Sequence, residues 1–239
     1  MSAEIIPSII TDLQTFCDVH KLPDDHGMSH FLAVFENAKC ALEIEKLSNS
    51  QNLCILLASL LHDVDDKKFF KTINNKNARD LLMNYVCEEQ ISLIIEMISL
   101  VSTSENGNST IICKADEKWK LIPRDCDRIE ALGNVGINRC YEYTLSIGNP
   151  IYTDSTPLPV TTLQLEAVCH GRFDEYQKNK KSISMIDHFY DKLLHLHKLS
   201  SGNKYLQEIA DQRHTQMVEW LIEHNTNLQA KRYPIRLAD

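Results

Sequence analysis

Glycine and proline are scarce in this sequence, with seven of each among 239 residues. Long stretches are instead rich in Leu, Ile, Glu and Lys, residue types that favour α-helix. The composition therefore predicts an all-α fold. The chain is long enough to bury one sizeable hydrophobic core without disulfides or structural metals as staples.

Other features are missing altogether. No C-x-x-C pair occurs, and the eight cysteines stand singly, mostly within apolar helical patterns, which predicts reduced thiols rather than a disulfide framework or a zinc knuckle. No stretch reaches the roughly 18 apolar residues of a membrane span, and the start lacks a basic segment followed by an apolar one. The net charge of −8 argues against a general nucleic-acid surface. We expect a soluble cytoplasmic protein without membrane contact.

Apolar spacing and cap residues divide the chain into helices. Helices are predicted over residues 8–20, 29–47, 51–63, 80–85, 89–101, 123–145 and 204–224, with another that starts after Ser184 and stops before Gly202. Segment 102–109 is predicted as a surface loop, and 148–162, with three prolines, as a lid-like loop. Gly133 and Gly136 are expected to permit close helix contact. We find no linker, so we expect a single domain over 1–239, with its core at about 10–225.

The dipeptide His62-Asp63 ends the almost wholly apolar stretch 53–61. A run that is apolar on every face belongs to a buried helix, where an ionised Asp costs several kcal/mol unless something positive neutralises it. A hydrogen-bonded His-Asp pair is the commoner arrangement. A bound metal ion is the alternative.

Further histidines and carboxylates favour the metal. His26 and His30 stand four residues apart near the start of one predicted helix, and Asp125 and Asp127 open another. Helical proteins assemble metal sites in their core from such groups on separate helices.

Four stretches carry a resemblance to a known family. They are Ser29-His30 followed by Val34, LLHDVDDKKF at 60–69, DCDRIEALG at 125–133 followed by Gly136-Ile137, and 181–194 ending in HFYDKLL. These motifs resemble the HD-domain superfamily of metal-dependent phosphohydrolases. They are most similar to the branch that includes bacterial nucleoside triphosphate pyrophosphohydrolases and uncharacterised fungal and viral proteins. The resemblance implies a single HD-domain helical bundle with a metal site in its core.

The resemblance also implies the metal ligands His30, His62, Asp63 and Asp127. Two imidazoles and two carboxylates suit one divalent ion, whether Mn²⁺, Mg²⁺, Fe²⁺, Ni²⁺, Co²⁺ or Zn²⁺. Binuclear members carry extra histidines between the HD pair and the final Asp, but residues 64–126 contain none, so we expect one metal. The first motif departs from the branch, because Ala33 stands where an Arg is common.

Roles near the metal follow from charge and position. A carboxylate close to the attacking water would be the general base, and Asp66 and Glu130 are the candidates, although either could equally be a solvated helix residue. Cations must hold the remaining phosphates. The candidate substrate contacts are His26, Lys67, Lys68, Arg128, His188 and Lys192. His26 could equally be an ordinary turn histidine, and exposed lysines are usually only solubilising.

The sequence thus predicts a phosphohydrolase that acts on a small phosphorylated metabolite, with a nucleotide as the first choice. The reaction would release phosphate from a nucleotide or pyrophosphate from a nucleoside triphosphate. The alternative from another class is a non-catalytic, metal-containing sensor of nucleotides or metabolites. The oligomeric state is open, with a homodimer as one option.

Overall fold

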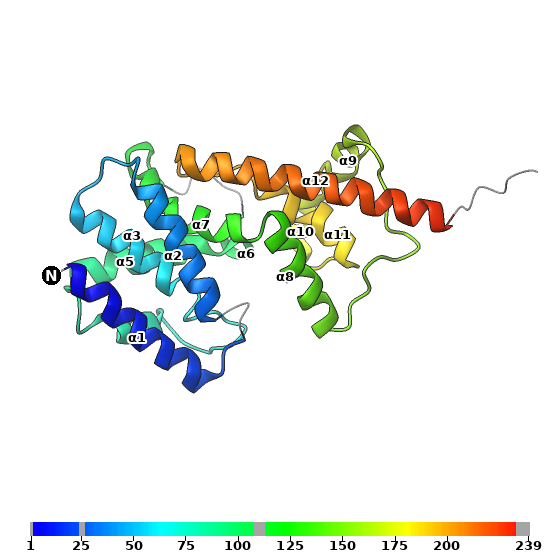
Figure 1. The fold of residues 1–239 in the computed structure, drawn as a ribbon. Coiled ribbons are helices and arrows are strands. Elements are labelled where there is room, and N and C mark those ends of the chain that lie inside the picture. The colour runs from blue at the N-terminus through cyan, green and yellow to red at the C-terminus, as the bar shows by residue number, and fades with distance from the viewer. Residues whose placement is uncertain (1, 24–26, 108–112, 233–239) are drawn as a thin grey trace, which may run out of the picture. The chain divides into compact units, whose positions relative to one another are not determined.

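The structure is a computed structural model that describes residues 2–23, 27–107 and 113–232, and within these ranges it contains helices and no strand (Figure 1). The predicted all-α class is confirmed. The chain divides into two compact units. Unit 1 comprises Met1–Glu130 and Leu199–Gln207, and unit 2 comprises Ala131–Lys198 and Glu208–Asp239. The expected single domain over 1–239 stays a prediction. Within the described ranges no helix is both long and apolar enough to span a membrane.

Unit 1 is built around a buried helix, α3. Its helices are α1 Ser2–His20, α2 Met28–Leu42, α3 Asn49–Leu61, α4 Lys76–Leu82, α5 Glu88–Val101, α6 Thr103–Asn106, the 3₁₀ helix η2 Ala115–Leu121, and α7 Ile122–Glu130. Helix α3 packs against α2, α5 and α7 (Figure 1). Nearly all of its residues from Leu53 to Leu61 are buried, as their all-round apolar pattern predicts. Ser48 and Gln51 form a capping box at its start.

Several helix bounds differ from the sequence prediction. Helix α1 begins earlier, at Ser2, and contains Pro7 in its second turn. Helix α2 ends at Leu42 instead of residue 47. Helix α4 also begins earlier, because Asp65 accepts hydrogen bonds from the backbone N–H groups of Asn77 and Ala78 at its first turn. The predicted loop 102–109 contains the four-residue helix α6, and residues 108–109 lie outside the described part.

The helix predicted over 123–145 is wrong, because the structure has two helices there. Helix α7 ends at Glu130, and α8 runs from Gly133 to Ser146. Gly133 has φ +67°, a left-handed conformation that interrupts the helix. A Cβ atom on Gly136 would lie 2.1 Å from the carbonyl oxygen of Ala131, so the chain folds back on itself at this glycine. The two glycines therefore serve a break as well as close packing.

Unit 2 contains α8, four helical segments after it, and most of the last helix. These are α9 Thr162–Cys169, α10 Arg172–Asn179, α11 Met185–Asp191, η3 Leu193–His195 and α12 Lys204–Arg232, of which unit 2 holds the part from Glu208. Ser184 caps α11 by accepting a hydrogen bond from the backbone N–H of Asp187, which confirms the predicted cap. Helix α11 then ends at Asp191 rather than continuing towards Gly202. Helix α12 extends eight residues beyond the predicted end at His224.

Residues 148–161, here called the strap, are non-helical as predicted. Helices α11 and α12 hold the strap through its backbone carbonyls. Pro150 and Ile151 accept from the first N–H groups of α11, and the Asn225 amide of α12 donates to Pro159 over 2.9 Å. The Tyr190 hydroxyl donates to Pro157. Movement of this segment as a lid stays a prediction, and a lid would have to break these contacts.

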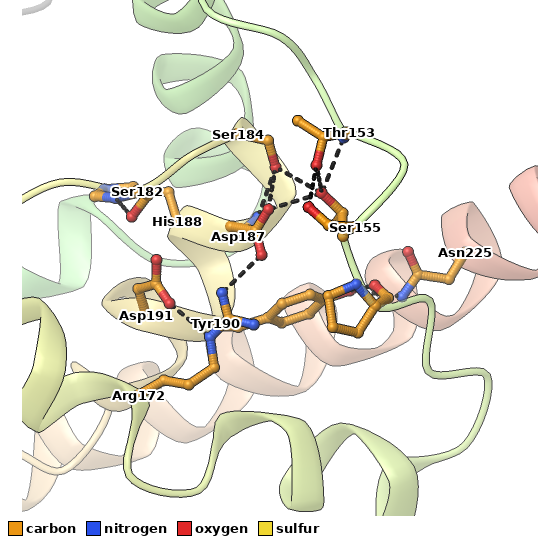
Figure 2. Close-up of polar contacts among 12 residues, drawn as sticks. Thr153, Ser155, Arg172, Ser182, Ser184, Asp187, His188, Tyr190, Asp191 and Asn225 are labelled. Atoms are coloured by element: carbon orange, nitrogen blue, oxygen red, sulfur yellow. Dashed lines mark hydrogen bonds and ion pairs between the residues drawn. The ribbon is translucent and has the colours of Figure 1, made fainter.

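A buried carboxylate joins the strap to two helices of unit 2. Figure 2 shows Asp187 between Ser184 and the guanidinium of Arg172, and the Thr156 hydroxyl of the strap donates to its Oδ2 over 2.7 Å. Arg172 donates to Oδ1 of Asp187 through Nη2 and to Oδ1 of Asp191 through Nε, both over 2.6 Å. Both carboxylate oxygens of Asp187 accept hydrogen bonds, and these bonds offset the cost of burying its negative charge.

Candidate metal centre

The position of His62 at the end of α3 orients its imidazole ring. It is the C-cap residue of α3 and is buried, with 5% of its surface exposed. Its Nδ1 atom lies 2.9 Å from the carbonyl oxygen of Ser59, one turn earlier. A carbonyl only accepts, so Nδ1 carries the proton and Nε2 keeps its lone pair free to bind a metal.

Three side chains from three parts of unit 1 converge at this Nε2. His30 lies in the first turn of α2, and its Nε2 is 3.1 Å from Nε2 of His62. Oδ1 of Asp127, in α7, lies 3.3 Å from the nitrogen of His30 and 3.6 Å from that of His62. The ligand atoms of these three residues all lie within 4.8 Å of one another.

Asp63, the fourth predicted ligand, borders this group. Its Oδ2 lies 3.5 Å from Nε2 of His62 and 3.9 Å from Nε2 of His30, but the tight group of three does not include it. Its side chain is 27% exposed, much like the 28% of Asp127, so Asp63 is only partly buried, whereas the sequence pattern predicted a carboxylate inside the core. Asp63 lies in the turn that follows the end of α3 at Leu61.

The spacing of these atoms fits a divalent ion. Ligands about 2.1 Å from an ion lie about 3.0 Å apart along the edges of an octahedron and about 3.4 Å apart in a tetrahedron. The separations of 3.1 to 3.6 Å within the group of three fall near these values. Imidazole and carboxylate donors suit several transition metals and Mg²⁺, so the residues fit the group without selecting it.

The electrostatics of the cluster favour a positive charge at its centre. Burial lowers the pKa of His62, but the carboxylates of Asp63 and Asp127 outweigh burial and raise the pKa to about 9. For Asp127 burial has the opposite effect and raises the pKa. The neighbouring His30 and His62 outweigh burial and hold the pKa of Asp127 well below its usual range. Either a proton on His62 or a bound cation would neutralise the negative charge of these carboxylates.

The predicted pair Asp125 and Asp127 separates in the structure. Only Asp127 faces the cluster, whereas Asp125 is fully buried. Oδ2 of Asp125 accepts hydrogen bonds from the backbone N–H groups of Ser200 (2.9 Å) and Ser201 (2.7 Å). Asp125 thus anchors the segment that returns to unit 1.

The two candidate bases differ in their surroundings. Asp66 follows the HD pair in the turn after α3, is 19% exposed at its side chain, and accepts a hydrogen bond from the backbone N–H of Lys68. Glu130, one turn after Asp127, is buried, and its Oε1 accepts from the amide of Asn37 over 2.8 Å.

The predicted cations of unit 1 also differ in exposure. Lys67 is exposed and forms an ion pair with Glu105, and the Lys68 ammonium lies 3.7 Å from Asp66. Arg128, next to Asp127, is buried, and burial lowers its pKa to about 10. Its Nη2 donates to the carbonyl of Gly107, while Nε and Nη1 are buried and have no hydrogen-bond partner within the described ranges.

The other predicted substrate contacts lie elsewhere. His26 falls outside the described residues. His188 and Lys192 belong to α11 and its C-cap in unit 2. Burial, with a smaller effect of Lys192, lowers the pKa of His188 to about 3, so this imidazole is neutral at physiological pH.

Sequence reasoning missed two residues that support the cluster. Ser59 orients His62 through its backbone carbonyl, which no side-chain pattern reveals. Asn37 was detectable, since it lies seven residues after His30 and therefore on the same face of α2.

Comparison with known proteins finds a viral relative. "Uncharacterized protein L803" of Acanthamoeba polyphaga mimivirus is 40% identical to this chain over an alignment of 215 residues, and the match covers 82% of this chain and 87% of that protein. No protein-family model matches the chain.

Solved structures share the fold over nearly the whole length. An HD-superfamily hydrolase from Bacillus thuringiensis superposes with a TM-score of 0.67 at 23% identity, covering 96% of this chain and all of that one. YpgQ of Bacillus subtilis, crystallised in complex with ADP, gives a TM-score of 0.65 at 20% identity and covers 99% of each chain. The predicted HD-domain fold is confirmed.

Proposed function

This chain belongs to the same family as the mimivirus protein and has the fold of the HD-superfamily hydrolases, and from its site we propose that it is a metal-dependent phosphohydrolase. Its substrate would be a small phosphorylated metabolite, with a nucleotide as the first choice. The observation that carries this proposal is the convergence of His30, His62 and Asp127, with Asp63 at the border. YpgQ in its complex with ADP supports the nucleotide by analogy of fold.

The protein's own residues divide the work around one divalent ion. His30, His62, Asp63 and Asp127 would hold the ion, which when bound acidifies water and neutralises phosphoryl oxygens. Asp66 is partly exposed on the turn after the HD pair, so it is the carboxylate we favour for accepting the proton of the attacking water. Glu130, the other carboxylate named from the sequence, is buried and accepts a hydrogen bond from Asn37, so we do not assign it this role.

Arg128 is the cation in unit 1 that we favour for binding a phosphate. Two of its guanidinium nitrogens are buried and have no partner among the residues that the structure describes, and such groups are costly unless an anion satisfies them. Its neighbour in sequence is the ligand Asp127. Lys67, Lys68, His188 and Lys192 stay predicted contacts, and the exposure of Lys67 and its pairing with Glu105 make it the weakest of them.

Turnover of a nucleotide panel tests the proposal. The purified protein, supplied in turn with Mn²⁺, Mg²⁺, Co²⁺ or Ni²⁺, is expected to release phosphate or pyrophosphate from at least one nucleotide. Asp63→Ala should lower this release at least about 100-fold, because loss of a direct ligand exceeds the 10- to 100-fold cost of losing an outer partner.

The matched control is Asp80→Ala, which removes an exposed carboxylate of α4 that pairs with Lys76. It should keep the wild-type rate. Equal rates for Asp63→Ala and wild type, or no turnover with any metal, would count against the enzyme.

A metal-containing sensor is the competing function. It would bind a nucleotide and gain thermal stability without forming product over hours. Product formation by the wild type, lost in Asp63→Ala, rules the sensor out as the sole function.

A further inference from the structure

Polar side-chain contacts join α2 to α7, and two of them concern the metal centre. The first is His30 with Asp127, at 3.3 Å. The second is the amide of Asn37, which donates to the carboxylate of Glu130 over 2.8 Å. The two helices also pack against each other.

Helix geometry places the second contact on the same faces of α2 and α7 as the first. Asn37 lies seven residues after His30, which is about two turns and about 10.5 Å along α2 on the same face. Glu130 lies three residues after Asp127, about 4.5 Å along α7 and again on the same face. The Glu130 carboxylate therefore contacts α2 about two turns after His30, towards the C-terminal end of that helix.

The environment of Glu130 suits a fixed role. The residue is 7% exposed, so its carboxylate depends on protein donors rather than on water. A general base must reach the attacking water and exchange a proton with it. A carboxylate held by an amide on the neighbouring helix suits the fixing of two helices relative to each other.

We propose that Asn37 and Glu130 are positioning residues for the metal centre. Their hydrogen bond holds α2 and α7 in the register at which His30 and Asp127 converge. Glu130 then acts on the metal through Asp127 and the helix they share, and it leaves the role of base to Asp66. This inference rests on the proposed metal site.

Three variants separate positioning from base catalysis. Asn37→Leu removes the donor at similar volume, and Glu130→Ala removes the acceptor. Glu130→Gln keeps an oxygen that can accept from Asn37 but removes the carboxylate. The dissociation constant for Mn²⁺ is measured by titration calorimetry, and kcat is measured on the best substrate of the wild type. Thermal unfolding confirms that each variant is folded, and Glu130→Ala carries the test if Asn37→Leu does not fold.

We expect Asn37→Leu and Glu130→Ala each to weaken Mn²⁺ binding about tenfold or more, the cost usual for groups that orient ligands. Glu130→Gln should weaken it less than about threefold and lower kcat less than tenfold. The inference is overturned if Asn37→Leu binds Mn²⁺ like the wild type, or if Glu130→Gln binds Mn²⁺ normally but loses about 10² to 10⁴ in kcat, as a lost base would. Failure of the wild type to bind any divalent ion would instead refute the proposed metal site.

Discussion

At the scale of single residues, two buried histidines have pKa values that are shifted in opposite directions. Both His62 and His188 are shielded from water, which disfavours the charged imidazolium. Beside His62 stand two carboxylates, and its pKa rises to about 9. Around His188 burial itself lowers the pKa, with a smaller effect of Lys192, and the value falls to about 3. Burial lowers the pKa of both histidines, and the carboxylates beside His62 reverse its effect there.

His188 should make unit 2 sensitive to acid. Its pKa is about 3 in the folded chain against 6.5 as the ordinary value, so the unfolded chain binds more protons between these pH values. Stability from this residue is therefore complete above about pH 6.5 and is lost as the pH falls towards 3. Between pH 7 and pH 5 the loss should be about 2 kcal/mol.

Urea unfolding at pH 7 and pH 5 measures this effect. His188→Gln should show a smaller difference between the two pH values than the wild type. His170→Gln, at an exposed position of unit 2, is the control and should match the wild type. Identical pH dependence of the two variants would contradict the assignment.

At the scale of elements, the break between α7 and α8 ends the helix that carries Asp127. Helix α7 stops at Glu130, the last residue of this stretch of unit 1, and α8 starts with the left-handed Gly133 in unit 2. The turn depends on Gly136, whose hydrogen faces the backbone of Ala131 at a distance where no side chain fits.

Gly136→Ala should therefore destabilise the protein by about 3 kcal/mol, the upper end of the usual cost of overpacking, because the added Cβ meets backbone that cannot rotate away. Gly148→Ala is the matched control in the strap. Gly148 also has a positive φ, of +70°, but no atom lies within 4 Å of the added Cβ, so only about 1 kcal/mol of conformational strain is expected. Thermal unfolding gives both values, and equal losses would show that the clash is relieved.

The elements also show what a sequence can and cannot predict. The buried helix ending at His62 was predictable, because its pattern is apolar on every face. The break after Glu130 was missed. Helix propensity assigns a glycine a penalty of only about 1 kcal/mol, and it contains no information about the close contact between Gly136 and Ala131. The start of α4 was missed for a similar reason, since its cap, Asp65, lies more than ten residues away in sequence.

The candidate site divides in the same way. The ligands were predictable from motif spacing, whereas the opposite fates of Asp125 and Asp127 depend on contacts with Ser200 and with His30. Only the folded chain brings those partners together.

At the scale of the whole molecule, the metal centre ties together segments that are far apart in sequence. Its ligands come from α2, from the end of α3 and from α7, so a bound ion would crosslink three parts of unit 1. An ion that binds the folded chain alone stabilises it by mass action.

Addition of Mn²⁺ at about 100 times its dissociation constant should stabilise the protein by about 2.7 kcal/mol. For a chain of this size, that gain raises Tm by about 5 to 10 °C. A chelator should reverse the shift, and Asp127→Ala should abolish it. An equal shift in Asp127→Ala would place the ion elsewhere. Scanning calorimetry with and without the ion is the measurement.

Unit 1 consists of two separate stretches of the sequence, and this affects its folding during synthesis on the ribosome. Asp125 is buried in α7, yet its backbone donors belong to Ser200 and Ser201, 75 and 76 residues later. At about 5 to 20 residues per second, translation needs about 4 to 15 s to cover that interval. Throughout this time the nascent α7 carries a carboxylate whose final partners have not yet been synthesised. The contacts of the helix that presents Asp127 are thus completed only after the whole first segment of unit 2, Ala131–Lys198, has been translated.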